Sequence, residues 1–328
     1  VWGQKAKLKA ADGANNDRFG YSVALSGDTA LVGAYGDDDS GDYSGSAYIF
    51  IRSGTSWSQQ AKLAASDDGA SLSRHDTSGD FFGFSVALSG DTALVGAYGD
   101  DDSGADSGSA YVFIRSETSW SKQTMLTAGD SASNDRFGFS VALSGDTALI
   151  GAYQDNDEGV ASGSAYVFVR SGTDWWLQAK LTAGDGATND WFGTSVALSG
   201  DTALVGAYQD DDRGSSSGSA YVFVRYGTLW SLQDKLTASD GAAGDYFGYA
   251  VALENDTALI GAYQDDDKGD SSGSAYVFTR SGTTWSQQAK LTANDGTIRD
   301  NFGWTLALSG DTALIGTDGD DVRGNDSG

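Results

Sequence analysis

The sequence predicts an all-β protein, a β-propeller of four-stranded antiparallel blades, and three observations predict it. The dipeptide Phe-Gly recurs first after 63 residues and then four times after 55 residues, starting at Phe19, Phe82, Phe137, Phe192, Phe247 and Phe302. Each unit holds four short apolar or alternating segments. Turns rich in Gly, Asp and Ser separate them, and no window shows a helical period. Four strands repeated at this period are typical of propeller blades, and six repeats are visible.

Within one repeat unit, the residue pattern of each segment predicts a particular strand or turn. Residues 57–63 alternate in part and predict an outer strand, whereas residues 84–88 alternate apolar with small side chains and predict the innermost strand. Ser89-Gly90-Asp91 predicts a hairpin turn, in which glycine supplies a positive φ. Residues 92–98 are nearly all apolar or small, which predicts a strand buried on both faces. Residues 109–115 are β-branched and aromatic and predict the third strand.

The order of motifs resembles the FG-GAP repeat: Phe-Gly, a strand, and then Gly-Ala-Tyr at the end of the next strand. The resemblance covers essentially the whole chain. It implies the propeller of integrin α-subunits and bacterial surface proteins, one domain over residues 1–328, and an extracellular or cell-surface location. Integrin-type repeats carry a calcium loop between the first two strands. Here that connection is only Ser26-Gly27-Asp28 and its equivalents, so the family's calcium ligands do not transfer by position.

The two ends of the chain raise the question of blade number. Residues 2–8 predict an outer strand that no blade precedes, and the last unit has no third strand equivalent to residues 274–280. We expect the N-terminal strand to complete the last blade and close the ring. The missing strand leaves three readings: a fragment of a longer chain with seven blades, six blades with one strand absent from this sequence, or a strand donated by a neighbouring subunit of a filament.

Composition excludes several classes of partner. The 328 residues include 20 Lys and Arg against 46 Asp and Glu, a net charge of −26, which disfavours nucleic acids and anionic membrane surfaces. There is no cysteine, so disulfides and thiolate metal sites are excluded. No apolar run approaches the ~18 residues that a membrane-spanning helix needs. We therefore expect no nucleic acid and no membrane insertion.

Acidic loops follow the second strand of each unit. Adjacent carboxylates ~6 Å apart repel by about 0.7 kcal/mol per pair even at the dielectric constant of water, so their repetition favours a bound cation. Hard oxygen ligands followed by glycine suit Ca²⁺. The first and third residues of each triplet should point the same way, which makes these the candidate metal ligands: Asp37, Asp39, Asp100, Asp102, Asp155, Asp157, Asp210, Asp212, Asp265 and Asp267. The alternative is that they are ordinary solvated turn residues.

A second acidic series precedes each Phe-Gly, and we expect it on the same rim of the blades, where a cation could bridge both series. Its members are Asp17, Asp80, Asp135, Asp190, Asp245 and Asp300. Tyrosines that end the second strands either cover this edge or stack on sugars; these are Tyr35, Tyr98, Tyr153, Tyr208 and Tyr263. The Phe of each Phe-Gly and the outer-strand Trp residues are expected to pack between blades.

Function follows from symmetry. An active site needs one asymmetric constellation, but the acids recur in every unit, and the only histidine, His75, lies in a polar insertion. We find no nucleophile motif, phosphate loop or histidine-based metal site. We therefore expect no enzyme but a calcium-stabilised extracellular module for adhesion, recognition or structural assembly, with a protein or glycan ligand at the cell surface. The alternatives are a lectin-like propeller or a self-assembling filament subunit.

Overall fold

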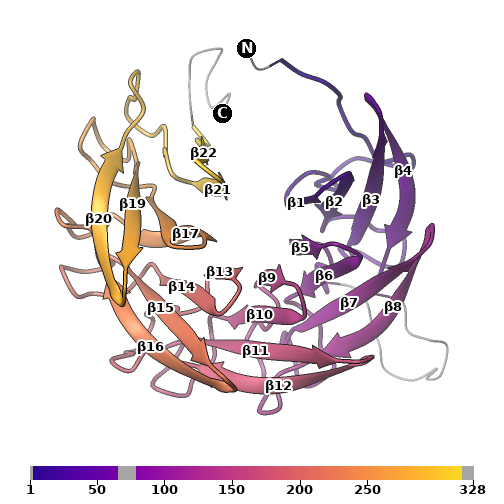
Figure 1. The fold of residues 1–328 in the computed structure, drawn as a ribbon, viewed down its shortest axis with the longest axis horizontal. Helices are drawn as coiled ribbons and strands as arrows, with labels where there is room; N and C mark the ends of the chain where they lie inside the picture. Colours follow the sequence, from indigo (N-terminus) through magenta and orange to yellow (C-terminus); the bar gives the residue numbers. More distant parts are fainter. Residues whose placement is uncertain (1–2, 66–78, 320–328) are drawn as a thin grey trace. The chain divides into compact units, whose positions relative to one another are not determined.

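The computed structural model describes residues 3–65 and 79–319, and within them every regular element is a β-strand. There are five four-stranded antiparallel sheets and one two-stranded sheet, which match six blades of a propeller (Figure 1). Blades 1 to 5 are β1–β4, β5–β8, β9–β12, β13–β16 and β17–β20, and blade 6 is β21–β22. In each sheet the strands follow one another in chain order.

Corresponding strands of the blades differ by at most one residue in length, except the first strands, which range from four residues in β1 to eight in β17. The first strands are β1 (Val23–Ser26), β5 (Ser85–Ser89), β9 (Ser140–Ser144), β13 (Ser195–Ser199), β17 (Phe247–Glu254) and β21 (Thr305–Ser309). The second strands are β2 (Thr29–Ala34), β6 (Thr92–Ala97), β10 (Thr147–Ala152), β14 (Thr202–Ala207), β18 (Thr257–Ala262) and β22 (Thr312–Gly316). The third strands are β3 (Ser46–Ser53), β7 (Ser109–Ser116), β11 (Ser164–Ser171), β15 (Ser219–Tyr226) and β19 (Ser274–Ser281). The fourth strands are β4 (Ser56–Leu63), β8 (Ser119–Leu126), β12 (Asp174–Leu181), β16 (Leu229–Leu236) and β20 (Thr284–Leu291).

The strands predicted for one unit are confirmed to within one residue at most ends. The predicted segments 57–63, 84–88, 92–98 and 109–115 correspond to β4, β5, β6 and β7. Every residue of β6 is buried, as expected for a strand covered on both faces. The local pattern suffices here because period-two alternation and turn chemistry decide each hairpin.

The chain divides into two compact units. The N-terminal unit comprises Val1–Ile150 and Val169–Trp176, and the C-terminal unit comprises Gly151–Phe168 and Leu177–Gly328. The expectation of one domain over residues 1–328 stays a prediction.

The core of each unit lies between successive blades. In the N-terminal unit Leu31 and Ile49 of blade 1 share a buried cluster with Phe82 and Val95 of blade 2. In the C-terminal unit the equivalent cluster joins blades 4 and 5 and includes Phe247. The Phe of these Phe-Gly motifs is therefore core packing, as predicted, because an apolar ring gains most by leaving water altogether.

The outer-strand tryptophans also connect blades, as predicted. The indole N–H of Trp230 donates to Oε1 of Gln178 at 2.8 Å, and that of Trp285 donates to Gln233 at 3.0 Å. In the N-terminal unit Trp120 makes the same bond to Gln60 at 3.0 Å. Each indole thus packs as a hydrophobic body while its polar tip is satisfied by the preceding blade.

One expectation about the ends of the chain differs from the structure. Residues 3–8 form no strand, so the outer strand predicted there was wrong, because an alternating pattern forms a strand only where a ladder partner is present. Closure of a ring by the N-terminal segment stays a prediction. In the described residues β22 has no third strand beside it, whereas the second strand of every other blade has one. Leu314 of β22 is 72% exposed, whereas its equivalents Leu204 and Leu259 are fully buried.

None of the described residues forms a helix long and apolar enough to cross a membrane. His75 and its insertion lie outside the described residues.

Candidate functional site: the acidic loops

Each acidic loop connects the second strand of a blade to the third, and its first aspartate is buried. The residues are Asp37, Asp100, Asp155, Asp210 and Asp265, each between 1% and 3% exposed. A buried carboxylate is costly unless it is paired and hydrogen-bonded, so its partners define the site.

The partners of Asp265 come entirely from its own blade. The backbone N–H of Asp267 and the hydroxyl of Ser274 donate to Oδ1, at 3.1 and 3.0 Å. The hydroxyl of Tyr276 donates to Oδ2 at 2.8 Å, and the ammonium of Lys290 donates to the same oxygen at 2.7 Å. Both carboxylate oxygens are therefore satisfied by the chain itself.

Sheet register brings the lysine to this point. Tyr276 of β19 pairs directly with Lys290 of β20, and a register shift between Val277 and Phe278 follows on β19. Directly paired residues share one face of a sheet, so the lysine extends along the tyrosine ring, with its Nζ 5.3 Å from the ring centroid. The Lys290 side chain is thereby directed at the acidic loop that precedes β19.

The ammonium lies among three carboxylates. Nζ of Lys290 is 2.8 Å from Oδ2 of Asp240 and 2.7 Å from Oδ2 of Asp265. It is also 2.5 Å from Oδ2 of Asp267. Asp240 comes from the linker before the blade, so the group joins a linker, a loop and a strand.

The same group recurs in other blades. Lys235 in blade 4 lies 2.7 Å from Asp185, 2.9 Å from Asp210 and 2.6 Å from Asp212. Lys62 in blade 1 lies 2.9 Å from both Asp12 and Asp37 and also pairs with Asp39.

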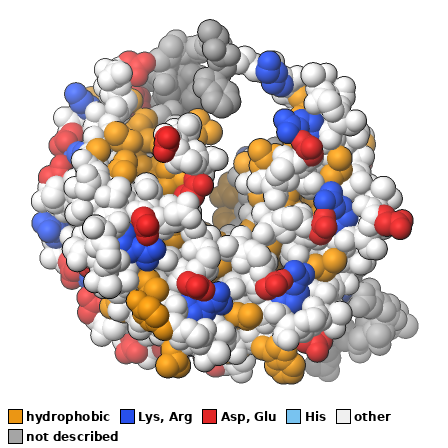
Figure 2. Space-filling view, in the orientation of Figure 1, with side chains coloured by type: hydrophobic (Ala, Val, Ile, Leu, Met, Phe, Trp, Pro, Cys, Tyr) orange, Lys and Arg blue, Asp and Glu red, His pale blue; other side chains and the backbone are white. Residues whose placement is uncertain are grey.

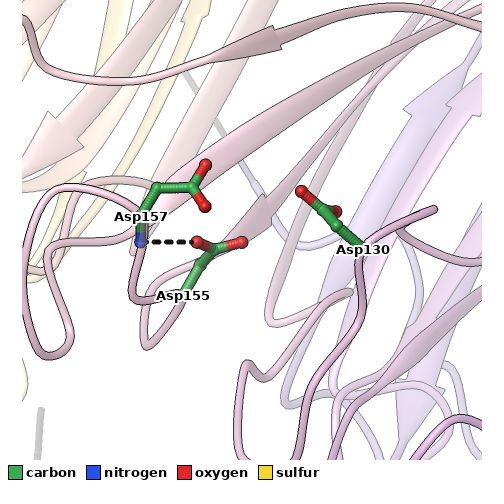
Figure 3. Close-up of side chains that lie close together, drawn as sticks. All are labelled: Asp130, Asp155 and Asp157. Carbon is green, nitrogen blue, oxygen red and sulfur yellow. Dashed lines mark hydrogen bonds between the residues drawn. The ribbon is translucent and has the colours of Figure 1, made fainter.

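In blade 3 Lys180 lies 3.0 Å from Asp155 and pairs with Asp157. Figure 3 shows these two carboxylates and the bond from the Asp157 N–H to Asp155 Oδ1, which measures 3.1 Å. The predicted orientation of the first and third aspartates is thus confirmed. The face in view in Figure 2 likewise shows acidic and basic side chains side by side.

Ionisation follows this geometry. Burial alone would lower the pKa of the Lys290 ammonium, but its hydrogen bonds to Asp240, Asp265 and Asp267 raise that pKa well above its ordinary value. Burial would raise the pKa of Asp240, but the hydrogen bond from Lys290 holds it below the usual range. Burial and the neighbouring Asp265 charge raise the pKa of the Tyr276 hydroxyl far above its usual value. The group therefore holds a charged Lys290, an ionised Asp240 and a protonated Tyr276.

These oxygens also have the spacing of a metal site. Two groups lie wholly in the C-terminal unit, and in each one oxygen per residue lies within 4.8 Å of the others; they are Asp185, Asp210 and Asp212, and Asp240, Asp265 and Asp267. Such a group could hold a metal ion. The lysine ammonium already lies among the same oxygens, and a divalent ion about 3 Å from it would be repelled by about 11 kcal/mol at an effective dielectric constant of about 20. While the lysine ammonium lies among these three carboxylates, they cannot also hold a divalent ion.

The middle aspartate of each loop has a different role. Asp266 accepts the N–H of Ser271 at 2.8 Å, and Asp38 accepts that of Tyr43 at 2.9 Å. Both side chains close the loop on itself, as Asx-type bonds do. The prediction that the middle residue points elsewhere is confirmed.

The second acidic series lies at the same blade end, as predicted, but it does not join the lysine groups. The carbonyl of Asp245 accepts from Gln264 N–H at 3.4 Å, next to the acidic loop. The Asp245 carboxylate instead accepts the N–H of Ala242 at 2.7 Å and closes its own turn. Burial and the nearby Asp265 charge raise the pKa of Asp245 to about 6. The linker residue in the group is Asp240, five residues earlier.

Blade 2 differs at one position. Its first aspartate, Asp100, accepts the Tyr111 hydroxyl at 2.6 Å and the Asp102 N–H at 2.9 Å. The strand residue that pairs with Tyr111 is Met125 instead of a lysine. Blade 2 nevertheless has an ammonium beside this tyrosine, because Nζ of Lys122, from the same strand as Met125, lies 5.8 Å from the centroid of the Tyr111 ring.

Aromatic side chains form a row beside the acidic loops in each unit. In the C-terminal unit, partly buried rings are in contact one after another, with centroids 4.4 to 5.5 Å apart: Tyr153, Trp191, Tyr208, Tyr246, Tyr249, Tyr263 and Trp304. In the N-terminal unit the row runs through Tyr21, Tyr35, Phe81, Phe84, Tyr98 and Phe139. The Gly-Ala-Tyr tyrosines thus do cover the blade edge, and they keep part of their surface exposed.

Sequence reasoning found the loop aspartates but missed the residues that complete each group. These are the linker residues Asp12, Asp185 and Asp240, the tyrosines Tyr48, Tyr166, Tyr221 and Tyr276, and the lysines Lys62, Lys180, Lys235 and Lys290. A signal existed, because the last three lysines recur every 55 residues, as the aspartates do.

Comparison with known proteins gives one family. The sequence matches the FG-GAP repeat in six segments that span most of its length: residues 2–50, 57–113, 120–168, 175–223, 230–278 and 285–328. No curated protein matches the chain.

Proposed function

Since the chain belongs to the FG-GAP repeat family, whose repeats build β-propellers, we propose that it is a non-enzymatic extracellular module for adhesion, recognition or structural assembly. FG-GAP repeats are typical of extracellular proteins. The proposal places the protein outside the cell or on its surface, with a protein or glycan ligand and with no nucleic-acid partner.

One observation carries the proposal: partly exposed aromatic rings and the acidic loops share one end of the blades. Tyr21 in the N-terminal row is 55% exposed while its ring centroid lies 4.7 Å from that of Tyr35 and 4.9 Å from that of Phe84. Rings that support one another and still face solvent offer contact area with little loss of side-chain entropy, as recognition surfaces do. Repetition in successive blades suits multivalent contact.

The test compares two exposed tyrosines, one at the acidic-loop end of blade 1 and one at the other end of blade 4. Tyr226 is 64% exposed and ends β15, away from the acidic loop. We expect Tyr21→Ala to weaken attachment of the protein to cell-surface material or matrix at least several-fold and Tyr226→Ala to leave it unchanged. Equal binding by both variants and the wild type would remove the aromatic row from the function.

Glycan binding is the second candidate, and the aromatic row favours it, because aromatic faces stack on sugar rings. A glycan array probed with wild type and Tyr21→Ala separates it from protein recognition. Signals on defined glycans that Tyr21→Ala loses support the lectin, whereas attachment to protein-coated surfaces alone supports the leading proposal.

Assembly by strand donation is the alternative that β22 favours. Leu314 is exposed on a strand whose equivalents in other blades are buried between two neighbours. A strand of the Ser-Ala-Tyr type from another chain would cover it in the register seen between β18 and β19. Sedimentation should then show oligomers for the wild type and monomers for Leu314→Lys, because a charge on an edge strand opposes pairing.

Stabilisation by bound calcium is a further part of the proposal. The aspartate groups support a cation as occupant, and a calcium-bound form would require each lysine to leave the carboxylates that it contacts. Attachment measured in calcium and in EDTA tests whether the proposed function needs the ion.

A further inference from the structure

We infer that the outer-strand lysine is the resident cation of the acidic loop in blades 1, 3, 4 and 5, so that these loops are complete without calcium. The lysines are Lys62, Lys180, Lys235 and Lys290. The loop aspartates of this chain thus keep the oxygen arrangement of a cation site and fill it with a covalently attached ammonium.

The distances around Lys235 show that one ammonium can pair with three carboxylates. Nζ of Lys235 lies 2.6 to 2.9 Å from one oxygen of each of three aspartates, and an ammonium has three N–H donors for three acceptors. The carboxylate oxygens of Asp185, Asp210 and Asp212 lie within 4.8 Å of one another, as ligands of one cation must. One ammonium therefore meets the demand that a metal ion would otherwise meet.

Both carboxylate oxygens of the buried aspartate, Asp210, already accept hydrogen bonds from the chain itself. Asp210 is 3% exposed, and its Oδ1 accepts from the Asp212 N–H at 3.1 Å and the Ser219 hydroxyl at 3.0 Å. Its Oδ2 accepts from the Tyr221 hydroxyl at 2.8 Å as well as from Lys235. A metal ion at Oδ2 would therefore have to take the place of the Lys235 ammonium.

The same tyrosine–lysine pairing recurs in several blades. Paired residues of the third and fourth strands place Tyr48 opposite Lys62, Tyr221 opposite Lys235 and Tyr276 opposite Lys290. The lysine is therefore fixed by sheet register and is not an incidental surface contact. An ion pair held by register loses less side-chain entropy than a free surface pair.

The experiment exchanges the lysine for the residue that blade 2 has at this position. Lys290→Met removes the ammonium from Asp240, Asp265 and Asp267. Lys268→Met is the matched control, because Lys268 is exposed in the same loop and the change in net charge is identical. Lys290→Gln is the second variant if the methionine does not fold.

Calcium titration by calorimetry and thermal unfolding, each against EDTA at constant ionic strength, give the readout. We expect Lys290→Met to bind one calcium ion more than the wild type and to regain in calcium the unfolding midpoint that it loses in EDTA. Lys268→Met should behave as the wild type. Wild-type crystals soaked in calcium should show no ion among Asp240, Asp265 and Asp267.

Two results would overturn the inference. The first is an ion among these three aspartates in the soaked wild-type crystals, with Lys290 turned away. The second is a folded Lys290 variant that gains no calcium site, or gains no more than Lys268→Met does. Attachment to cell-surface material is not part of this readout, so loss of the proposed function would leave the inference standing, and the reverse also holds.

Discussion

The carbonyl oxygen of Gly83 lies 2.0 Å from the position that a Cβ on Gly33 would occupy. Gly33 belongs to Gly-Ala-Tyr at the end of β2, and Gly83 belongs to Phe-Gly at the start of the next blade. The same approach joins Gly96 to Gly138 and, in the C-terminal unit, Gly206 to Gly248. The two motifs that define the repeat are therefore two sides of one backbone contact, where only glycine fits.

The first prediction concerns this contact. Gly206→Ala places a methyl group 2.0 Å from the Gly248 carbonyl, and we expect a loss of roughly 1–3 kcal/mol in the free energy of unfolding, because backbone on both sides resists movement. Gly184→Ala is the control, since no atom lies within 4 Å of its Cβ position. Urea unfolding measures both, and equal stabilities would show that the blades separate easily at this point.

The second prediction concerns the charge on the lysine group. Lys290→Met leaves the buried Asp265 and its two neighbours without their ammonium, which should cost about 3 kcal/mol at pH 7 in the absence of divalent ions. Lys290 lowers the pKa of Asp240, so this stability is present above the unfolded pKa of about 3.9 and is lost as the pH falls through the lower folded value. The gap between variant and wild type should therefore shrink below about pH 4. A gap that is the same at pH 3 and pH 7 would point to lost packing alone.

The third prediction concerns Asp245, whose pKa burial raises to about 6. The unfolded value is about 3.9, so the contribution of this group is most favourable below about pH 4 and is lost as the pH rises through about 6. Asp245→Asn keeps an acceptor for the Ala242 N–H without the charge. We expect it to be more stable than the wild type by about 1–2 kcal/mol at pH 8, with no gain at pH 4. Asp266→Asn changes an exposed side chain and should leave the free energy of unfolding unchanged. An equal gain in stability from Asp266→Asn would mean that Asp245→Asn acts only by lowering the net negative charge.

The fourth prediction concerns the bond between blades 4 and 3 made by Trp230 and Gln178 within the C-terminal unit. Trp230→Phe removes the indole N–H, and Gln178→Leu removes its acceptor. A double-mutant cycle should give a coupling of about 1 kcal/mol, as for a partly buried hydrogen bond. Trp176→Phe is the control, because Trp176 is 64% exposed. A coupling near zero would mean that the indole contributes by packing only.

The strands and the acidic loops could be predicted because their determinants are local. Thr92–Ala97 is apolar or small throughout, and the Gly90 turn before it fixes a hairpin, so β5 and β6 follow from neighbouring residues alone. The N-terminal outer strand could not be predicted correctly from its own pattern. A strand exists only with a partner, and residues 3–8 find none in the described part of the chain.

By itself the sequence determined the repeat, its four-strand unit and the first and third aspartates of each loop, because turn chemistry and side-chain alternation act over a few residues. Only the tertiary structure decided what those aspartates bind. Lys290 lies 25 residues from Asp265 and 50 from Asp240 along the chain, and the register of β19 and β20 brings all three together. The physical reason is that a charge buried by one segment must be neutralised by another, and folding selects the partner.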